Sequence, residues 1–142
     1  MANLSKSKYI TYCQCPKALW LKQYKSEEMV IDPLTQARFD AGTEVGELAK
    51  RLFGDFVEAT TYKTAVDGTQ RLDLGAMVAA TQKALAEGAE NIAEAAFIYD
   101  GCYCAVDLLH KTPHGYAIYE VKSSTDLKEL EVYAQDVAYQ KY

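Results

Sequence analysis

Three apolar runs in the last third of the chain are separated by two turn signals. Asp100-Gly101 lies between the first two runs, where an Asp-Gly pair is a strong signal for a two-residue β-hairpin. A Pro- and Gly-containing turn at 112–115 separates the second run from the third. Since such short turns join antiparallel neighbours, the sequence predicts a three-stranded meander with strands at 91–99, 102–109 and 116–122.

Helical spacing of apolar residues predominates elsewhere. Ser5 or Ser7 is placed to cap a first helix, and Pro16 predicts a kink or a fresh start within it. Gly54 lies where a second helix would end, and Gly88 where a third would end. The predicted helices cover 5–24, 34–53, 73–87 and about 127 to 142, and an irregular β-prone stretch with an Asp67-Gly68 turn covers 56–72.

Length and composition are those of a single globular domain. The 142 residues are 49% hydrophobic and 25% charged, with a net charge of −5. No apolar run approaches the roughly 18 residues of a membrane helix, and no signal peptide is evident at the N-terminus. We therefore expect no membrane partner and a cytoplasmic location.

Charge is distributed unevenly along the chain. Residues 1–26 contain five lysines and no acid, so this segment carries +5 and the remainder carries −10. A locally positive segment can meet nucleic-acid phosphates even when the net charge is negative. It can equally be a solvated helix face. In the first case the candidate nucleic-acid-binding residues are Lys6, Lys8 and Lys17.

Two neighbouring predicted strands each carry an acid among apolar residues. Glu120 and Lys122 are two positions apart, so their side chains are expected on one strand face, and a meander can bring Asp107 beside them. Two converging carboxylates repel each other unless a cation lies between them, which favours a hard ion such as Mg²⁺ or Mn²⁺. The alternative is an acid–lysine ladder on an exposed strand.

A metal ion at this position would polarise a scissile phosphate and lower the pKa of a bound water. Lys122 could orient or help to deprotonate that water and offset negative charge in the transition state. The apolar flanks of both strands favour this reading, because unpaired charge is costly in a buried strand.

Four segments together resemble the RecB-like branch of the PD-(D/E)XK nucleases, including the CRISPR-adaptation nucleases and a set of uncharacterised bacterial proteins. The first is Asp107 followed by Glu120-Val121-Lys122-Ser123-Ser124. The others are the opening S-x-S, C-P and Trp pattern of residues 5–20, the helix around Phe39–Ala49, and the final helix from Tyr133 to Tyr142. They cover nearly the whole chain in the order of that branch.

The resemblance implies an α/β (α+β) fold with a restriction-endonuclease-like core, in which a helix, a three-stranded meander and a helix precede a further strand. Residues 1–142 would form one domain, with a basic helical segment at 1–30 and the core at 34–142. The final core strand would be missing. The chain is therefore expected to need missing C-terminal sequence or a second copy of itself, which would cover an unpaired edge of the first or third strand.

The resemblance also implies roles for individual residues. Asp107 and Glu120 would bind the metal together with the carbonyl of Val121, and Lys122 would serve the attacking water. An acid of the first core helix often joins such a site, and Glu47 is slightly preferred here over Glu44. The final helix would contribute a catalytic glutamine, for which Gln140 fits the order best and Gln135 is the alternative.

The four cysteines form two C-x-C pairs. Cys102 and Cys104 share one face of a strand and are expected to be small core residues, although a cysteine-based metal-binding protein is a second alternative function. Related nucleases hold an iron–sulfur cluster through a cysteine that Cys15 matches. A complete cluster is not expected in this chain. His110 and His114 flank a turn and are expected to be exposed.

The leading hypothesis is a metal-dependent nuclease acting on DNA in repair, defence or CRISPR adaptation. The alternative is an inactive or fragmentary nucleic-acid-binding module of a larger machine.

Overall fold

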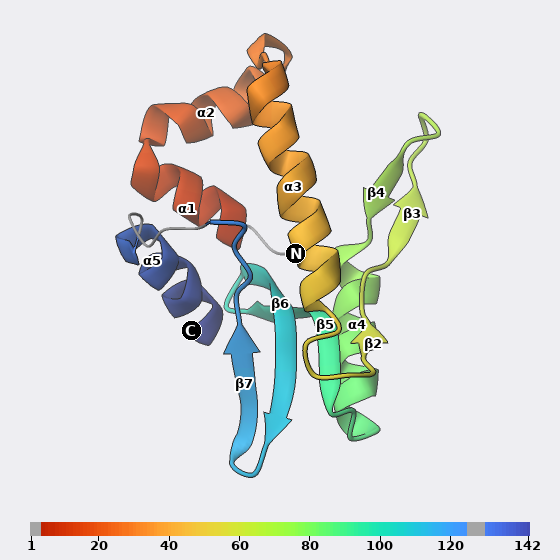
Figure 1. Cartoon of the computed structure of the whole chain (residues 1–142). Coiled ribbons are helices and arrows are strands. Elements are labelled where there is room, and N and C mark those ends of the chain that lie inside the picture. The colour runs from red at the N-terminus through yellow and green to blue at the C-terminus, as the bar shows by residue number, and fades with distance from the viewer. Residues whose placement is uncertain (1–3, 125–129) are drawn as a thin grey trace.

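The computed structural model describes residues 4–124 and 130–142 and has a mixed α/β architecture (Figure 1). A five-stranded sheet has the strand order β1-β6-β5-β2, and β7 also pairs with β6. The elements are β1 (Leu4–Ser5), α1 (Lys6–Gln14), α2 (Pro16–Tyr24), a 3₁₀ turn (Ser26–Glu28), α3 (Pro33–Ala49), β2 (Val57–Glu58), β3 (Tyr62–Thr64), β4 (Gln70–Leu72), α4 (Leu74–Ala86), β5 (Asn91–Tyr99), β6 (Cys102–Thr112), β7 (Gly115–Tyr119) and α5 (Leu130–Lys141).

The predicted meander is confirmed as β5, β6 and β7. Asp100 and Gly101 have φ values of 45° and 75°, as the two central residues of a type I′ hairpin require. The third strand is shorter than predicted, because β7 ends at Tyr119 and not at 122. The backbone N–H of Val121 instead donates to a carboxylate oxygen of Asp107 at 2.7 Å. A side chain of β6 thus takes the place of a strand partner beyond the end of β7.

Short parallel strands occupy both sides of the meander. β1 pairs with the start of β6, where Leu4 lies opposite Cys102, on the same edge that β7 takes further along. β2 pairs with the start of β5. The expectation that the first meander strand has an unpaired edge is therefore wrong for its first residues, since the irregular segment before it supplies a strand. Within the described residues, β7 pairs only with β6.

The hydrophobic core lies where α4 packs on β5. Thr81 is fully buried at this contact. The largest cluster of buried apolar residues consists of Ala59, Ala84, Ile92, Ala95, Val106 and Leu109.

The predicted helices are present with shifted ends. Ser5 caps α1 by accepting from the N–H of Lys8, and Pro16 begins α2, so the predicted break is confirmed. α3 starts after its cap Asp32 and ends at Ala49, four residues before the predicted end. The predicted start of the last helix at 127 lies outside the described residues. No described helix has the length and apolarity of a membrane span.

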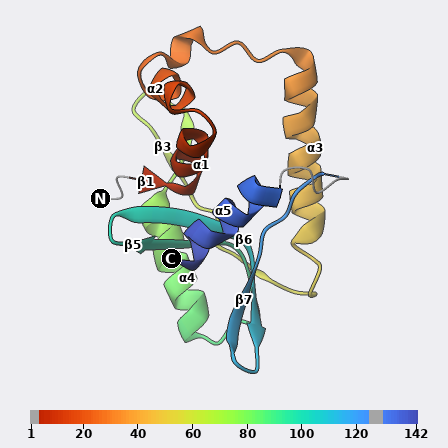
Figure 2. The same ribbon diagram turned by 90° about the vertical axis from the view of Figure 1, so that its left-hand side faces the viewer.

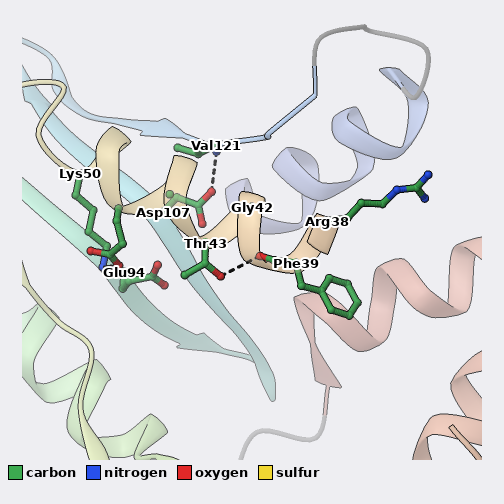
Figure 3. Close-up of a pocket in the computed structure, with 10 residues that line it drawn as sticks. Arg38, Phe39, Gly42, Thr43, Lys50, Glu94, Asp107 and Val121 are labelled. Atoms are coloured by element: carbon green, nitrogen blue, oxygen red, sulfur yellow. Dashed lines mark hydrogen bonds and ion pairs between the residues drawn. The ribbon is translucent and has the colours of Figure 1, made fainter. Parts of the chain in front are cut away.

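The α1–α2 pair and α3 lie on opposite sides of the view in Figure 2 and are joined by residues 25–32. α3 has no buried residue. Its C-terminal half passes beside the centre of the sheet, where it forms one wall of a cleft that the meander completes (Figure 3).

Candidate functional site

Asp107 lies in the middle of β6, and its carboxylate is tied to the segment that follows β7. Besides accepting the Val121 N–H, it is close enough to Glu120 for the two charges to interact. Burial, followed by the charge of Glu120, raises the pKa of the Asp107 carboxyl. The segment 120–122 thus lies against Asp107, although a loop and not a strand carries it. The convergence of the Asp107, Glu120 and Lys122 side chains on one metal ion stays a prediction.

Glu120 is partly buried, and three side chains donate to its carboxylate. Its carboxylate accepts from the Lys6 ammonium at 2.9 and 3.1 Å, from the Gln140 amide at 2.6 Å and from the Lys122 ammonium. Only 7% of its side chain is exposed. Gln140 therefore contacts the site as predicted from its place in the final helix, whereas Gln135, the alternative, is exposed.

Asp136 is the second acid of this arrangement and was missed by the sequence analysis. It accepts from Lys122 at 2.8 Å, from Lys6 at 3.2 Å and from Gln140 at 3.1 Å, and its side chain is 9% exposed. The only sequence signal was its place one helical turn before Gln140. We refer to Lys6, Glu120, Lys122, Asp136 and Gln140 as the ionic cluster.

Each charged group of the ionic cluster favours the ionised form of its partners. Burial alone would lower the pKa of the Lys122 ammonium, but its hydrogen bonds to Asp136 and Glu120 outweigh burial and raise it. Burial alone would raise the pKa of Asp136, and its bond to Lys122 and the charge of Lys6 lower it. Its two carboxylate partners therefore favour the charged form of Lys122.

A cleft of about 470 Å³ lies beside the ionic cluster, between α3 and the sheet (Figure 3). Asp107 and Val121 line one wall. Glu47 lines the other, where it forms an ion pair with Lys50 at 2.7 Å. Glu44 is exposed and is not part of the lining. Both candidate acids on α3 are exposed, but only Glu47 lines the cleft that Asp107 also lines.

Glu94 is a further cleft residue that the sequence analysis did not select. It stands in β5 opposite Asp107, since its neighbours Ala93 and Ala95 pair with Leu108 and Val106. Its φ of 54° is a left-handed value that a non-glycine residue rarely adopts. Burial, followed by the charge of Asp107, raises the pKa of the Glu94 carboxyl. The available signal was a lone acid within the apolar run of β5.

The predicted nucleic-acid-binding lysines have different environments. Lys8 and Lys17 are exposed, as binding to phosphates would require. The Lys6 side chain is only 18% exposed, and its ammonium is engaged by Glu120 and Asp136. Lys6 thus belongs to the ionic cluster and does not face solvent as a phosphate-binding lysine would. The reason is that the pairing of β1 with β6 brings the start of α1 to the site.

The cysteines and histidines are distributed over the molecule. Cys13 and Cys15 are exposed. Cys104 is buried in the sheet as predicted, whereas Cys102 is only partly buried. His110 is not an exposed turn residue: it lies in β6, and its ring stacks on Phe53 with centroids 4.0 Å apart. His114 is exposed. In the part of the chain that the structure describes, no group of three or more His, Cys, Asp or Glu residues is arranged to hold a metal ion.

The oxygen atoms at the site nevertheless fit a hard divalent cation in kind. Asp107 and Glu120 offer carboxylates, and Val121 offers a backbone carbonyl. The Oε1 atom of Gln140 is buried and has no hydrogen-bond partner among the described residues. An orphaned acceptor beside two acids suits an incoming cation. The obstacle is that ammonium groups already occupy the Glu120 carboxylate.

Comparisons of the chain with protein-family models, curated proteins and solved structures returned no significant match.

Proposed function

We propose that this chain is a metal-dependent nuclease domain with a restriction-endonuclease-like core that hydrolyses DNA phosphodiester bonds. The observation that carries the proposal is the 2.7 Å hydrogen bond from the Val121 N–H to Asp107. It holds the Glu-Val-Lys segment against an acid of the neighbouring strand, and this supports a D…ExK arrangement of the site. The resemblance to RecB-like nucleases adds the expectation of a role in repair, defence or CRISPR adaptation.

Each residue of the site has its own role in this proposal. Asp107, Glu120 and the carbonyl of Val121 would hold Mg²⁺ or Mn²⁺, which when bound supplies Lewis acidity to the phosphate and lowers the pKa of a water. Lys122, held as a cation by Asp136 and Glu120, offsets the negative charge that develops on the phosphate. Gln140 orients the Glu120 carboxylate through its amide.

A cleavage assay on end-labelled single- and double-stranded DNA tests this function. We expect cleavage with Mg²⁺ or Mn²⁺, none with EDTA, and a loss of about 10²-fold or more in Asp107→Asn, Glu120→Gln and Lys122→Met. Asp40→Asn and Glu131→Gln are matched controls, because both residues are exposed and lie outside the site. Cleavage that persists in EDTA, or that is unaffected by Asp107→Asn, would contradict the proposal.

A nucleic-acid-binding module without hydrolytic activity is the second candidate. The donors that occupy every oxygen of Glu120 favour it, because a metal ion would have to displace at least one of them. Retention of labelled DNA by the protein in a gel-shift assay, with no cleavage in any divalent cation, would select this candidate over the nuclease.

A further inference from the structure

Backbone contacts of the first residues fix the position of Lys6 at the site. Residues 4 and 5 pair with 102 and 103 of β6, and Ser5 caps α1, so Lys6 is the first residue of a helix anchored at both sides. The Tyr139 hydroxyl of α5 donates to the carbonyl of Leu4 at 3.0 Å. The Tyr9 and Tyr139 rings stack at 5.1 Å. The start of α1 is thereby held against β6 and α5 together.

The Lys6 ammonium lies between two carboxylates, as a metal ion would. It lies 2.9 Å from Glu120 and 3.2 Å from Asp136, between two carboxylates that are less than one-tenth exposed. With Lys122 the ionic cluster has two positive and two negative charges, so it is electrically balanced without a metal ion. Among the buried side-chain nitrogen and oxygen atoms of the described residues, only the Oε1 of Gln140 has no hydrogen-bond partner.

We propose that Lys6 gates the metal site: its ammonium and a divalent cation compete for Glu120, and binding of the cation releases the Lys6 side chain. This inference rests on the proposed function. With Lys6 in place an entering ion meets a neutral cluster and a carboxylate whose lone pairs are taken. With Lys6 displaced, the cluster carries one net negative charge next to Asp107, and the ion gains a carboxylate ligand with the Gln140 oxygen beside it.

The first experiment measures Mn²⁺ binding by the electron paramagnetic resonance signal of the free ion. Lys6→Met should bind Mn²⁺ roughly ten- to a hundredfold more tightly than the natural chain, since a charge-assisted contact no longer has to be broken. Lys8→Met removes a charge from the same helix without touching Glu120 and should change the affinity less than threefold. Equal Mn²⁺ affinity in the natural chain and Lys6→Met would overturn the gate.

The second experiment uses the unaltered chain and does not depend on the folding of a variant. Lysine acetylation by acetic anhydride is followed by peptide mass spectrometry with and without saturating Mn²⁺. Lys6 should react slowly in the absence of the ion and at least severalfold faster in its presence, while the exposed Lys8 and Lys17 should react alike in both. Unchanged protection of Lys6 at saturating Mn²⁺ would show that the ammonium stays on Glu120, and would overturn the gate.

Failure of the gate and failure of the proposed function give different results. If the protein cleaves DNA with Mn²⁺ while Lys6 stays protected, the nuclease stands and the gate falls. If Mn²⁺ releases Lys6 but no DNA is cleaved, the gate stands and the nuclease falls. If Mn²⁺ binds neither the natural chain nor Lys6→Met, both are overturned.

Discussion

The hydroxyl of Thr81 accepts a 2.8 Å hydrogen bond from the backbone N–H of Ala96, and thereby joins α4 to β5. The same hydroxyl donates to the carbonyl of Met77 within the helix at 3.0 Å. β2 pairs only with the first residues of β5. Further along β5, a helix side chain accepts the backbone N–H that points away from β6. Because Thr81 is fully buried, water cannot replace it as the partner.

Replacing Thr81 with valine should destabilise the protein by about 1–3 kcal/mol, because the shape is kept while the Ala96 N–H loses its partner. Urea unfolding followed by circular dichroism measures this change. Thr43→Val is the matched control. Thr43 also donates to a carbonyl one turn back, at Phe39, but it is exposed, and no N–H of a described strand donates to it. A loss in Thr43→Val as large as that in Thr81→Val would contradict the assignment.

Glu94 gives a prediction for pH. Its pKa is raised above the ordinary 4.5, first by burial and then by Asp107, so the folded chain binds this proton more tightly than the unfolded chain. The free energy of unfolding should therefore decrease as the pH rises from about 4.5 through the folded value. Glu94→Gln should be more stable than the natural chain at pH 7, and the difference should disappear below pH 4. Urea titrations across this range measure it.

The exposed Glu131→Gln is the control for Glu94→Gln and should change stability by less than about 0.5 kcal/mol at either pH. A Glu94→Gln variant that is less stable at pH 7 would mean that the carboxylate is stabilised by a contact, and not strained by burial.

The meander could be predicted because its signals are local. Asp100-Gly101 specifies a hairpin by the left-handed φ of both residues, and the apolar runs on either side fix the strands. The break at Pro16 is equally local. Helix ends were less accurate, since α3 has no buried residue and its end depends on weak local preferences.

The site was only partly predictable because its remaining members come from distant parts of the chain. Lys6 and Glu120 are 114 residues apart and meet only because β1 pairs with β6. Asp136 looked like an ordinary helix-surface acid. The positive φ of Glu94 has no signature in the sequence. Asp107, Glu120 and Lys122 could be proposed because they interrupt apolar runs that read as strands, although Glu120 and Lys122 lie just beyond the end of β7.

Cysteine reactivity should follow burial. Burial raises the pKa of the Cys104 thiol and also shields it, whereas Cys13 in α1 and Cys15 between α1 and α2 are exposed. Iodoacetamide at pH 8, followed by peptide mass spectrometry, should alkylate Cys13 and Cys15 at least tenfold faster than Cys104. In urea the three rates should become similar. Rapid labelling of Cys104 in the native chain would mean that β6 opens more readily than its place in the core implies.

The last prediction concerns Asp136, whose removal should destabilise the fold by about 3 kcal/mol at pH 7. Asparagine would leave two ammonium groups, those of Lys6 and Lys122, facing the single, largely buried carboxylate of Glu120. Burial alone would raise the pKa of Asp136, but Lys122 and Lys6 lower it below 3.8, so its contribution is present above that pH and is lost as the pH falls through the folded value. The stability difference between the natural chain and Asp136→Asn should therefore shrink in acid.

Asp40→Asn is the matched control for Asp136→Asn. Asp40 also accepts from a glutamine four residues away on the same helix, Gln36, at 2.8 Å, but it is exposed. Its replacement should change the free energy of unfolding by less than about 0.5 kcal/mol at any pH. If both variants lose the same small amount, the helical Asp–Gln contact accounts for Asp136, and the two lysines contribute nothing through it. A loss confined to Asp136→Asn that fades below pH 3.8 requires the buried charges, because only they distinguish the two sites.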